Sequence, residues 1–351
     1  MKILSIVGAR PQFIKLAPIS EKIKKLYTEI IIHTGQHFDK KMSDNFFSEL
    51  GISEPHYNLN INLGLHGEQT GRMLIELEKV VIKENPNLII IFGDTNSTLA
   101  GALVGSKLQL PTIHIEAGLR SFNKKMPEEI NRIVADHISD YLFAPTQSAM
   151  KNLEIENLSS KSFLTGDIMV DSHKSAVERT KGRLSLKKYD LEKEKYYILT
   201  LHRPYNVDNP KILSKIFSEL GKLSKQVVFP IHPRTRKIIG KDNINIPKNF
   251  LLTEPLGYLD FVRMQANCYK IITDSGGVQK EAYFLRKPCI TLRSETEWIE
   301  TVQEGWNLLL NPNEEDNLAY QIESFQPSNY PKQVFGENVA EKMISVLNKI
   351  I

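Results

Sequence analysis

Short apolar segments recur along the chain, and longer segments with helical spacing of their apolar residues separate them. The short segments are rich in β-branched residues, which is typical of buried strands. They occupy residues 3–7, 30–33, 88–92, 112–115 and 141–143, and then 196–199, 226–229, 270–272 and 289–291. Strands that alternate with helices predict parallel sheets with helices on both faces. The expected fold class is therefore α/β.

The stretch 172–195 interrupts this pattern, because it is highly charged and lacks a predicted strand. We interpret it as a helix followed by a connector. The sequence thus predicts an N-terminal Rossmann-like domain at 1–172, a C-terminal one at 173–335, and a last helix, 336–351, that packs back across the boundary. Open α/β sheets bind ligands at the carboxyl ends of their strands. Two such domains predict an interdomain active-site cleft that suits a nucleotide-linked substrate.

Composition narrows the class of protein. The 351 residues are 41% hydrophobic and 25% charged, as in globular proteins, and no apolar run is long enough for a membrane span or a signal peptide. The net charge of +4 is modest and its cations are interspersed with anions, which argues against nucleic acid as a partner. Cys268 and Cys289 show neither disulfide nor zinc spacing. We expect no metal, and a reducing cytoplasm.

The first predicted strand runs into the segment GARPQFIK. Pro11 suits the first position of a helix, so Arg10 is expected at the turn from strand to helix. A guanidinium beside a helix N-terminus is a good ligand for a diphosphate. A surface arginine that pairs with a carboxylate is the alternative. Lys15 lies one turn further and could reach the same ligand.

Three carboxylates follow predicted strands or open a predicted helix in the first half: Asp94 in GDTNST, Glu116 in HIEAGLR and Glu128 in PEEINR. Each has a simpler interpretation when taken alone, since Asp94 suits a helix N-cap and Glu128 suits a first helical turn. Together at one edge of a sheet they would need shared protons or cationic partners. That arrangement gives acid/base groups useful pKa values.

In the second half, His202 and Arg203 follow the predicted strand 196–199 and the two residues after it, Thr200 and Leu201. Both can donate to phosphate oxygens and stabilise a departing diphosphate. A purely structural histidine is the alternative interpretation.

The segment TDSGGVQKE predicts a strand, a tight turn and a helix. Backbone N–H groups of Ser275, Gly276 and Gly277 that have no acceptor within the protein would bind phosphate. Glu281 could accept from ribose hydroxyls. Glycines chosen only for packing are the alternative. The sequence lacks GxGxxG after the first strand, a P-loop lysine motif and HExxH, which disfavours NAD, ATP and zinc chemistry.

Taken in order, the motifs resemble those of the non-hydrolysing UDP-N-acetylglucosamine 2-epimerase family. They extend from residue 1 to about 312 and read GARPQFIK, HTGQHFD, GDTNSTLAGAL, HIEAGLRS, PEEINR, LHRP, HPRTR, TEPLGY, DSGGVQKEA and KPCITLRSETEW. The resemblance implies a GT-B-like pair of Rossmann domains, usually a homodimer, with no cofactor. It also implies anti elimination of UDP to a 2-acetamidoglucal, followed by re-addition of UDP to the opposite face.

The resemblance also implies roles for single residues. The family's acid/base carboxylates match Asp94, Glu116 and Glu128, and its ribose carboxylate matches Glu281. Its phosphate contacts match Arg10, His202, Ser275, Gly276 and Gly277. Lys15 falls on a further active-site position.

Some segments depart from the family's commonest pattern. Most members read GTRPEAIK and HRRE where this chain has GARPQFIK and HRPYN. Residues 66–70 and the pair Phe38 and Asp39 differ from the pattern by which many members bind an activating UDP-GlcNAc, so allosteric activation is not expected. GARPQFIK, LHRP with HPRTR, and SETEW instead resemble the branch that acts on UDP-2,3-diacetamido-2,3-dideoxy-glucuronate.

Three other functions compete with epimerisation of a UDP-N-acetylhexosamine. A GT-B glycosyltransferase would share the SGG turn and Glu281, but it would have no evident use for the GDTNS and PEEINR carboxylates. A hydrolysing 2-epimerase would release free sugar. A non-catalytic UDP-sugar binder would gain nothing from three carboxylates near an anionic ligand.

Overall fold

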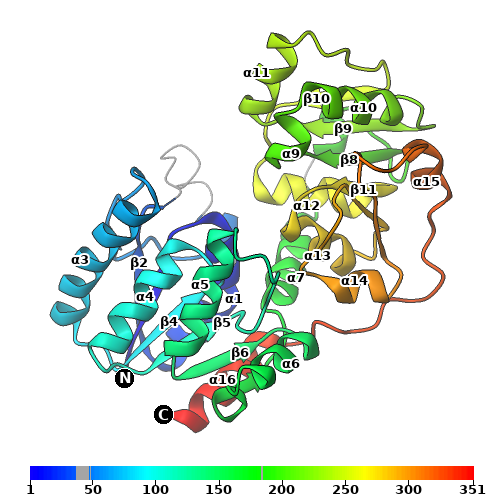
Figure 1. The fold of residues 1–351 in the computed structure, drawn as a ribbon. Helices are drawn as coiled ribbons and strands as arrows, with labels where there is room; N and C mark the ends of the chain where they lie inside the picture. The colour runs from blue at the N-terminus through cyan, green and yellow to red at the C-terminus, as the bar shows by residue number, and fades with distance from the viewer. Residues whose placement is uncertain (37–46, 48, 183–184) are drawn as a thin grey trace. The chain divides into compact units, whose positions relative to one another are not determined.

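The computed structural model describes residues 1–36, 47, 49–182 and 185–351, which divide into two compact units (Figure 1). Unit 1 comprises Met1–Lys174 and Gln333–Ile351, and unit 2 comprises Ser175–Lys332. The chain passes from unit 1 to unit 2 within helix α7 (Met169–Arg179). His37, Phe38 and Asp39 of the HTGQHFD motif lie outside the described residues.

The described residues of unit 1 form a seven-stranded parallel sheet. Its strands lie in the order β3 (Tyr57–Asn58), β2 (Thr28–His33), β1 (Lys2–Val7), β4 (Leu88–Phe92), β5 (Thr112–Ile115), β6 (Tyr141–Ala144) and β7 (Ser162–Leu164). The central strands β1 and β4 are apolar and almost entirely buried, as strands covered on both faces must be.

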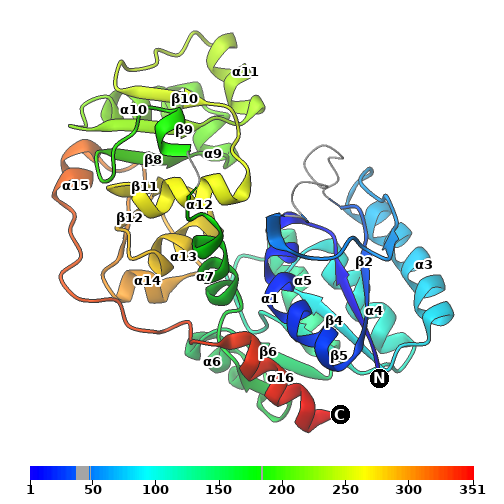
Figure 2. The same ribbon diagram turned by 180° about the vertical axis from the view of Figure 1, so that it is seen from behind.

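Helices cover both faces of this sheet (Figures 1 and 2). One face carries α3 (His66–Glu84), α4 (Asn96–Lys107) and α5 (Pro127–Ile138), whose apolar side chains join alternate residues of β1 and β4 in one core cluster. The other face carries α1 (Arg10–Leu26) and α16 (Val339–Ile350). The unit also contains α6 (Gln147–Ile155) and the 3-10 helix η1 (Ser159–Lys161).

The C-terminal helix belongs to unit 1 although the whole of unit 2 precedes it in the sequence. Lys22 on α1 forms an ion pair with Glu341 on α16 (2.9 Å), and the hydroxyl of Tyr27 donates to Asn348 (2.6 Å). These contacts and the apolar face of α16 explain why the last residues return to the N-terminal sheet.

The described residues of unit 2 form a six-stranded parallel sheet. Its strands lie in the order β10 (Phe250–Thr253), β9 (Gln226–Pro230), β8 (Tyr196–Thr200), β11 (Lys270–Thr273), β12 (Cys289–Thr291) and β13 (Asn307–Leu309). This order repeats that of the first six strands of unit 1. The predicted class of two Rossmann-like parallel sheets is confirmed.

Two core clusters lie on the two faces of the second sheet. One contains side chains of α10 (Pro210–Leu220), α11 (Pro233–Lys241) and α15 (Leu318–Ser324). The other contains side chains of α12 (Tyr258–Asn267) and α13 (Gly276–Phe284). The remaining described helices of this unit are α8 (Ser185–Lys188), α9 (Pro204–Val207) and α14 (Ile299–Gln303).

All nine strands predicted from the sequence are present in the structure. The four strands that the prediction missed, β3, β7, β10 and β13, lie at the edges of the two sheets. Their side chains are mostly half-buried, so they lack the continuous apolar run that marks a central strand. Among the described residues, no helix is long and apolar enough to cross a membrane.

Candidate active site

Each sheet has one point at which the order of its strands reverses. In the first sheet this point lies between β1 and β4, and in the second it lies between β8 and β11. Open α/β sheets bind their ligands at this position, beyond the carboxyl ends of the strands. Arg10 and Asp94 follow the first pair of strands, whereas His202 and Ser275 follow the second. These four predicted residues therefore lie at the two switch points, one in each unit.

Gln12 ties together the two loops at the first switch point. Its side-chain oxygen accepts from the N–H groups of Gly8 (2.7 Å) and Ala9 (3.0 Å), and its Nε2 donates to the carbonyl of Phe92 (2.7 Å). A glutamate, as in GTRPEAIK, could not donate that last bond. Arg10 is partly exposed and is the first residue of α1, so the helix begins one residue earlier than Pro11 predicted.

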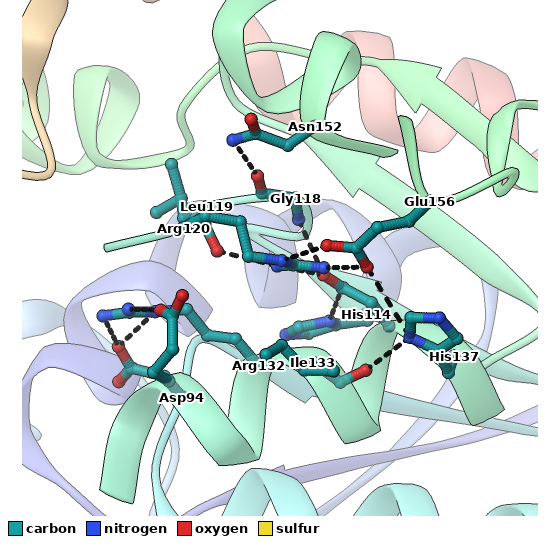
Figure 3. A network of polar contacts seen from close by, with 12 residues as sticks. Asp94, His114, Gly118, Leu119, Arg120, Arg132, Ile133, His137, Asn152 and Glu156 are labelled. Carbon is teal, nitrogen blue, oxygen red and sulfur yellow. Dashed lines mark hydrogen bonds and ion pairs between the residues drawn. The ribbon is translucent and has the colours of Figure 1, made fainter. Parts of the chain in front are cut away.

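Asp94 is held by an arginine from a distant helix (Figure 3). Its carboxylate accepts from Nε (3.0 Å) and Nη2 (2.6 Å) of Arg132, which is buried on α5. The N-cap of α4 is Thr95, whose hydroxyl accepts from the N–H of Thr98 (3.3 Å). The interpretation of Asp94 as an N-cap is therefore wrong, and its carboxylate is partly exposed beside a fixed cation.

The two glutamates of PEEINR have different environments. Glu129 is buried and accepts from the N–H groups of Ser121 (2.9 Å) and Phe122 (2.8 Å) and from Arg132 (2.8 Å). Burial opposes its ionisation, but these donors outweigh burial and lower the pKa of Glu129. Glu128 is exposed and lies four positions before Arg132, on the same face of α5. Glu128 is therefore the glutamate that is accessible for proton transfer.

Glu116 forms an ion pair with Lys15, and the two side chains are only 8% and 10% exposed. Gly93, which precedes Asp94, lies against this pair and has a φ of +64°. A Cβ on Gly93 would lie 3.0 Å from Nζ of Lys15 and 3.3 Å from a carboxylate oxygen of Glu116. The structure thus brings Lys15, Glu116 and Asp94 to the same edge of the sheet, with a cation beside each of the two carboxylates.

A buried aspartate, Asp274, organises the second switch point. Its carboxylate accepts from the N–H groups of His202 (3.1 Å) and Arg203 (3.0 Å) and from the Asn206 side chain (3.1 Å), and Nδ1 of His202 lies 3.1 Å away. Burial opposes ionisation of Asp274, but His202 and the other donors lower its pKa. Donation from Nδ1 leaves Nε2 of the exposed His202 ring for another partner.

Arg203 lies beside His202 and is partly exposed. Its Nε atom is buried and has no hydrogen-bond partner among the described residues. A buried donor of this kind is expected to bind an acceptor that is supplied by a ligand or by water.

The Ser-Gly-Gly turn opens α13 as predicted, but its three residues are not equivalent. The N–H of Ser275 already donates to the hydroxyl of Thr273 (2.9 Å), so the expectation of a bare N–H is wrong at this residue. A Cβ on Gly276 would lie 2.1 Å from Oε1 of Glu297, so a side chain there would require the Glu297 carboxylate to shift. Gly277 is exposed, and a Cβ there would meet nothing within 4 Å. Packing therefore does not explain Gly277.

Glu281 is buried in the second turn of α13. Its carboxylate accepts from Nε2 of Gln265 on α12 (2.9 Å), which is fully buried. Gln265, Asp274 and Arg132 were not assigned roles from the sequence, because their partners come from distant segments. In the described part of the chain, no group of three or more His, Cys, Asp or Glu side chains could hold a metal ion.

Comparison with known proteins identifies the family of this chain. The sequence profile of the UDP-N-acetylglucosamine 2-epimerase family matches residues 21–348. The chain belongs to this family. It is 49% identical to a UDP-N-acetylglucosamine 2-epimerase homologue of Methanococcus maripaludis, with full coverage of both chains. It is 47% identical to the UDP-2,3-diacetamido-2,3-dideoxy-D-glucuronate 2-epimerase of Pseudomonas aeruginosa, over 88% of each.

A solved structure shows the same fold class. The crystal structure of the UDP-GlcNAc 2-epimerase of Methanocaldococcus jannaschii, in complex with UDP-GlcNAc and UDP, superposes with a TM-score of 0.90. The two proteins are 43% identical, and the match covers 100% of each chain. The GT-B-like fold class predicted for this member of the epimerase family is thus confirmed.

Proposed function

We propose that the protein interconverts UDP-N-acetylglucosamine and UDP-N-acetylmannosamine without a redox cofactor. A carboxylate removes the proton from C2 while the C1–O bond breaks and its electron pair leaves with UDP. The 2-acetamidoglucal then regains a proton on the opposite face of C2, and UDP adds back at C1. One observation carries this proposal: two carboxylates at the same edge of the first sheet, Asp94 and Glu116, each lie beside a buried cation.

We assign the proton transfers to Asp94, Glu116 and Glu128. Carboxylates are proton acceptors, and the exposed Glu128 is open to water as a source of protons. Lys15 pairs with Glu116 at the same edge of the sheet, and we assign it a contact to the sugar nucleotide. A protein that only bound an anionic sugar nucleotide would not benefit from these negative charges.

We assign recognition of UDP to groups that offer donors. His202 presents Nε2, Arg203 has a buried Nε without a partner among the described residues, and Gly276 and Gly277 have first-turn N–H groups at the start of α13. Ser275 can contribute its hydroxyl, and Arg10 lies at the start of α1. The buried carboxylate of Glu281 is assigned to the ribose hydroxyls.

Proton NMR in D2O tests the proposal directly. Incubation with UDP-N-acetylglucosamine should replace the C2 proton by deuterium and produce the manno-configured sugar nucleotide. Free sugar plus UDP would instead identify a hydrolysing enzyme. Transfer to an added acceptor without exchange at C2 would identify a glycosyltransferase, and no reaction with any UDP-sugar would contradict the assignment as an enzyme.

A second substrate is favoured by the similarity to the Pseudomonas aeruginosa protein and by the motifs GARPQFIK and SETEW. UDP-2,3-diacetamido-2,3-dideoxy-glucuronate carries an additional C3 acetamido group and a C6 carboxylate. The same NMR assay with this compound, run in parallel, identifies the preferred sugar from the ratio of the two kcat/KM values.

We also propose that the protein is a homodimer in the cytoplasm. Ile75 and Ile82 are exposed seven positions apart on α3, on the face opposite the buried residues of that helix, where a second copy could cover them. The two cysteines are free and buried, which suits a reducing compartment. Light scattering of wild-type protein and of an Ile75→Asp variant tests the dimer, because only the variant should be monomeric.

A further inference from the structure

The turn that follows β5 is held in an unfavourable backbone conformation. Glu116 has a φ of +71°, which L-residues rarely adopt, and Gly118 has a φ of +81°. A Cβ on Gly118 would lie 2.5 Å from the carbonyl oxygen of Ala149, so only glycine fits there. Such a conformation persists only if the surrounding structure fixes it. The position of the Glu116 carboxylate therefore depends on the groups that bind this turn.

One of those groups is Asp136, a completely buried carboxylate on α5. It accepts from the N–H of Gly118 (3.0 Å) and pairs with Nη1 of Arg120 (2.7 Å). Arg120 in turn makes two bonds to Glu156 (2.7 and 2.8 Å), and the Asn152 side chain donates to the carbonyl of Gly118 (2.9 Å) (Figure 3). The turn is thus fixed by a carboxylate that is itself fixed by an arginine.

His114, the third residue of β5, connects this carboxylate to the other catalytic loop. Its Nδ1 lies 2.7 Å from Asp136, and its Nε2 lies 2.7 Å from the carbonyl of Gly93. A backbone carbonyl can only accept, so Nε2 must carry a proton. Nδ1 bonds to the Asp136 carboxylate, so the ring joins these two groups through both of its nitrogens.

The Asp136 carboxylate is paired in its buried position. It bonds to His114, to the guanidinium of Arg120 and to the N–H of Gly118. Burial opposes its ionisation, but His114 and Arg120 lower the pKa of Asp136. A buried carboxylate is tolerated when it is hydrogen-bonded in this way.

The cluster links the loops of two carboxylates that belong to different segments. Gly93 immediately precedes Asp94, and its Cα lies against the pair formed by Lys15 and Glu116. The carbonyl of the same glycine accepts from His114, which also binds the aspartate that fixes Gly118. A rotation of the His114 ring would therefore move both loops.

We propose that His114 and Asp136 are positioning residues for epimerisation, which fix the Asp94 and Glu116 carboxylates relative to one another without touching the substrate. This inference rests on the proposed function, because it assumes that these two carboxylates transfer the protons. Proton transfer requires donor and acceptor at hydrogen-bond distance, so small displacements of the base have large effects on rate.

The test compares Asp136→Asn, His114→Gln and their double variant with the wild type. Turnover of UDP-N-acetylglucosamine is measured per UDP-binding site, with the number of sites taken from calorimetry, so that unfolded protein does not count. We expect kcat to fall roughly tenfold to a hundredfold in each single variant, with KM and UDP affinity nearly unchanged. The double variant should be no slower than the slower single variant, since both changes break one linkage.

His137→Gln is the matched control, because His137 follows Asp136 in sequence but has an exposed ring. Among the described residues that ring bonds to the carbonyl of Ile133 and lies 3.7 Å from Glu156, and it contacts neither Gly93 nor Gly118. It should retain full turnover. An Asp136→Asn protein with wild-type kcat per site would overturn the inference. A wild type that exchanges no C2 proton would instead contradict the proposed function.

A measurement on the wild type covers the case in which the buried variants fail to fold. In ¹⁵N NMR of the folded protein, both ring nitrogens of His114 should show the chemical shifts of hydrogen-bonded nitrogens. A ring nitrogen of His114 without a hydrogen bond would contradict the linkage between Gly93 and Asp136, whatever the variants do.

Discussion

Lys15 on α1 and Glu116 after β5 form a nearly buried ion pair at the end of the strands that also lead to Asp94. A charge without its counter-ion in this environment is costly, whereas loss of both charges is far better tolerated. The pair therefore contributes both to the stability of unit 1 and to the proposed proton transfer. Mutation can separate its effect on stability from its effect on turnover.

We expect Lys15→Met to lower the free energy of unfolding by roughly 3 kcal/mol, because it leaves the Glu116 carboxylate buried without this partner. The double variant Lys15→Met/Glu116→Gln should regain part of that stability but none of the turnover. Urea denaturation and the C2 exchange assay measure the two quantities. Recovery of turnover in the double variant would show that the pair has only a structural role.

Asp94→Asn and Glu128→Gln should each reduce turnover roughly a hundredfold or more while UDP binding remains largely intact. Both changes remove proton acceptors and leave the proposed diphosphate ligands in place. The control is Glu76→Gln, a partly exposed carboxylate on α3 that forms an ion pair with Lys79, its one ion-pair partner in the described part of the chain. Near-normal turnover in both variants would remove these carboxylates from the mechanism.

Arg10→Ala should weaken UDP affinity by roughly tenfold, because a charge-assisted contact to phosphate is lost. Lys25→Ala, in the last turn of the same helix, is the matched control and should bind UDP normally. Titration calorimetry compares the variants. Unchanged affinity in Arg10→Ala would favour the interpretation of this residue as a surface arginine.

Gln265→Leu should weaken UDP binding, since Glu281 loses the amide that fixes its carboxylate. The loss should be much smaller for a UDP analogue whose ribose lacks both hydroxyls, because Glu281 then has no partner on the ligand. The exposed Gln303 at the end of α14 provides the control Gln303→Leu. An equal loss for both ligands would mean that Gln265 acts on packing rather than on Glu281.

Two buried histidines should make stability depend on pH. Burial lowers the pKa of His33 and of His173 to about 4, below the ordinary value of about 6.5. Between these values the unfolded chain binds protons that the folded chain does not, so stability falls as pH decreases from about 6.5 towards 4. At pH 5, each histidine should lower the free energy of unfolding by about 2 kcal/mol.

Urea midpoints at pH 7.5, 6 and 5 measure this effect. The lowered pKa values of Asp136 and Asp274 do not contribute in this window, because those carboxylates lose their stabilising effect only below their ordinary value of about 4. The urea midpoint should fall less steeply with decreasing pH in His33→Gln than in the wild type. An equal fall in both proteins would show that His33 does not cause this pH dependence.

The sequence alone was sufficient to predict the central strands, the two Rossmann-like sheets and the family. Central strands such as Leu88–Phe92 are buried on both faces, so their apolar run is a local signal. The candidate residues were predictable for a related reason: the ends of such strands are marked by the polar and glycine residues that directly follow them, as in GDTNST and DSGGVQKE.

Edge strands and the partners of the candidate residues depended on the tertiary structure. The edge strand Ser162–Leu164 is defined by its pairing with β6 and has no local pattern of its own. Asp94 and Arg132 are 38 positions apart, and neither position predicts that the other will bind it. Likewise, only the fold shows that Glu128 is exposed while Glu129 is buried, and that His114 has an acceptor at each ring nitrogen. Local sequence determines which elements form, whereas charge pairing and burial depend on how distant segments pack.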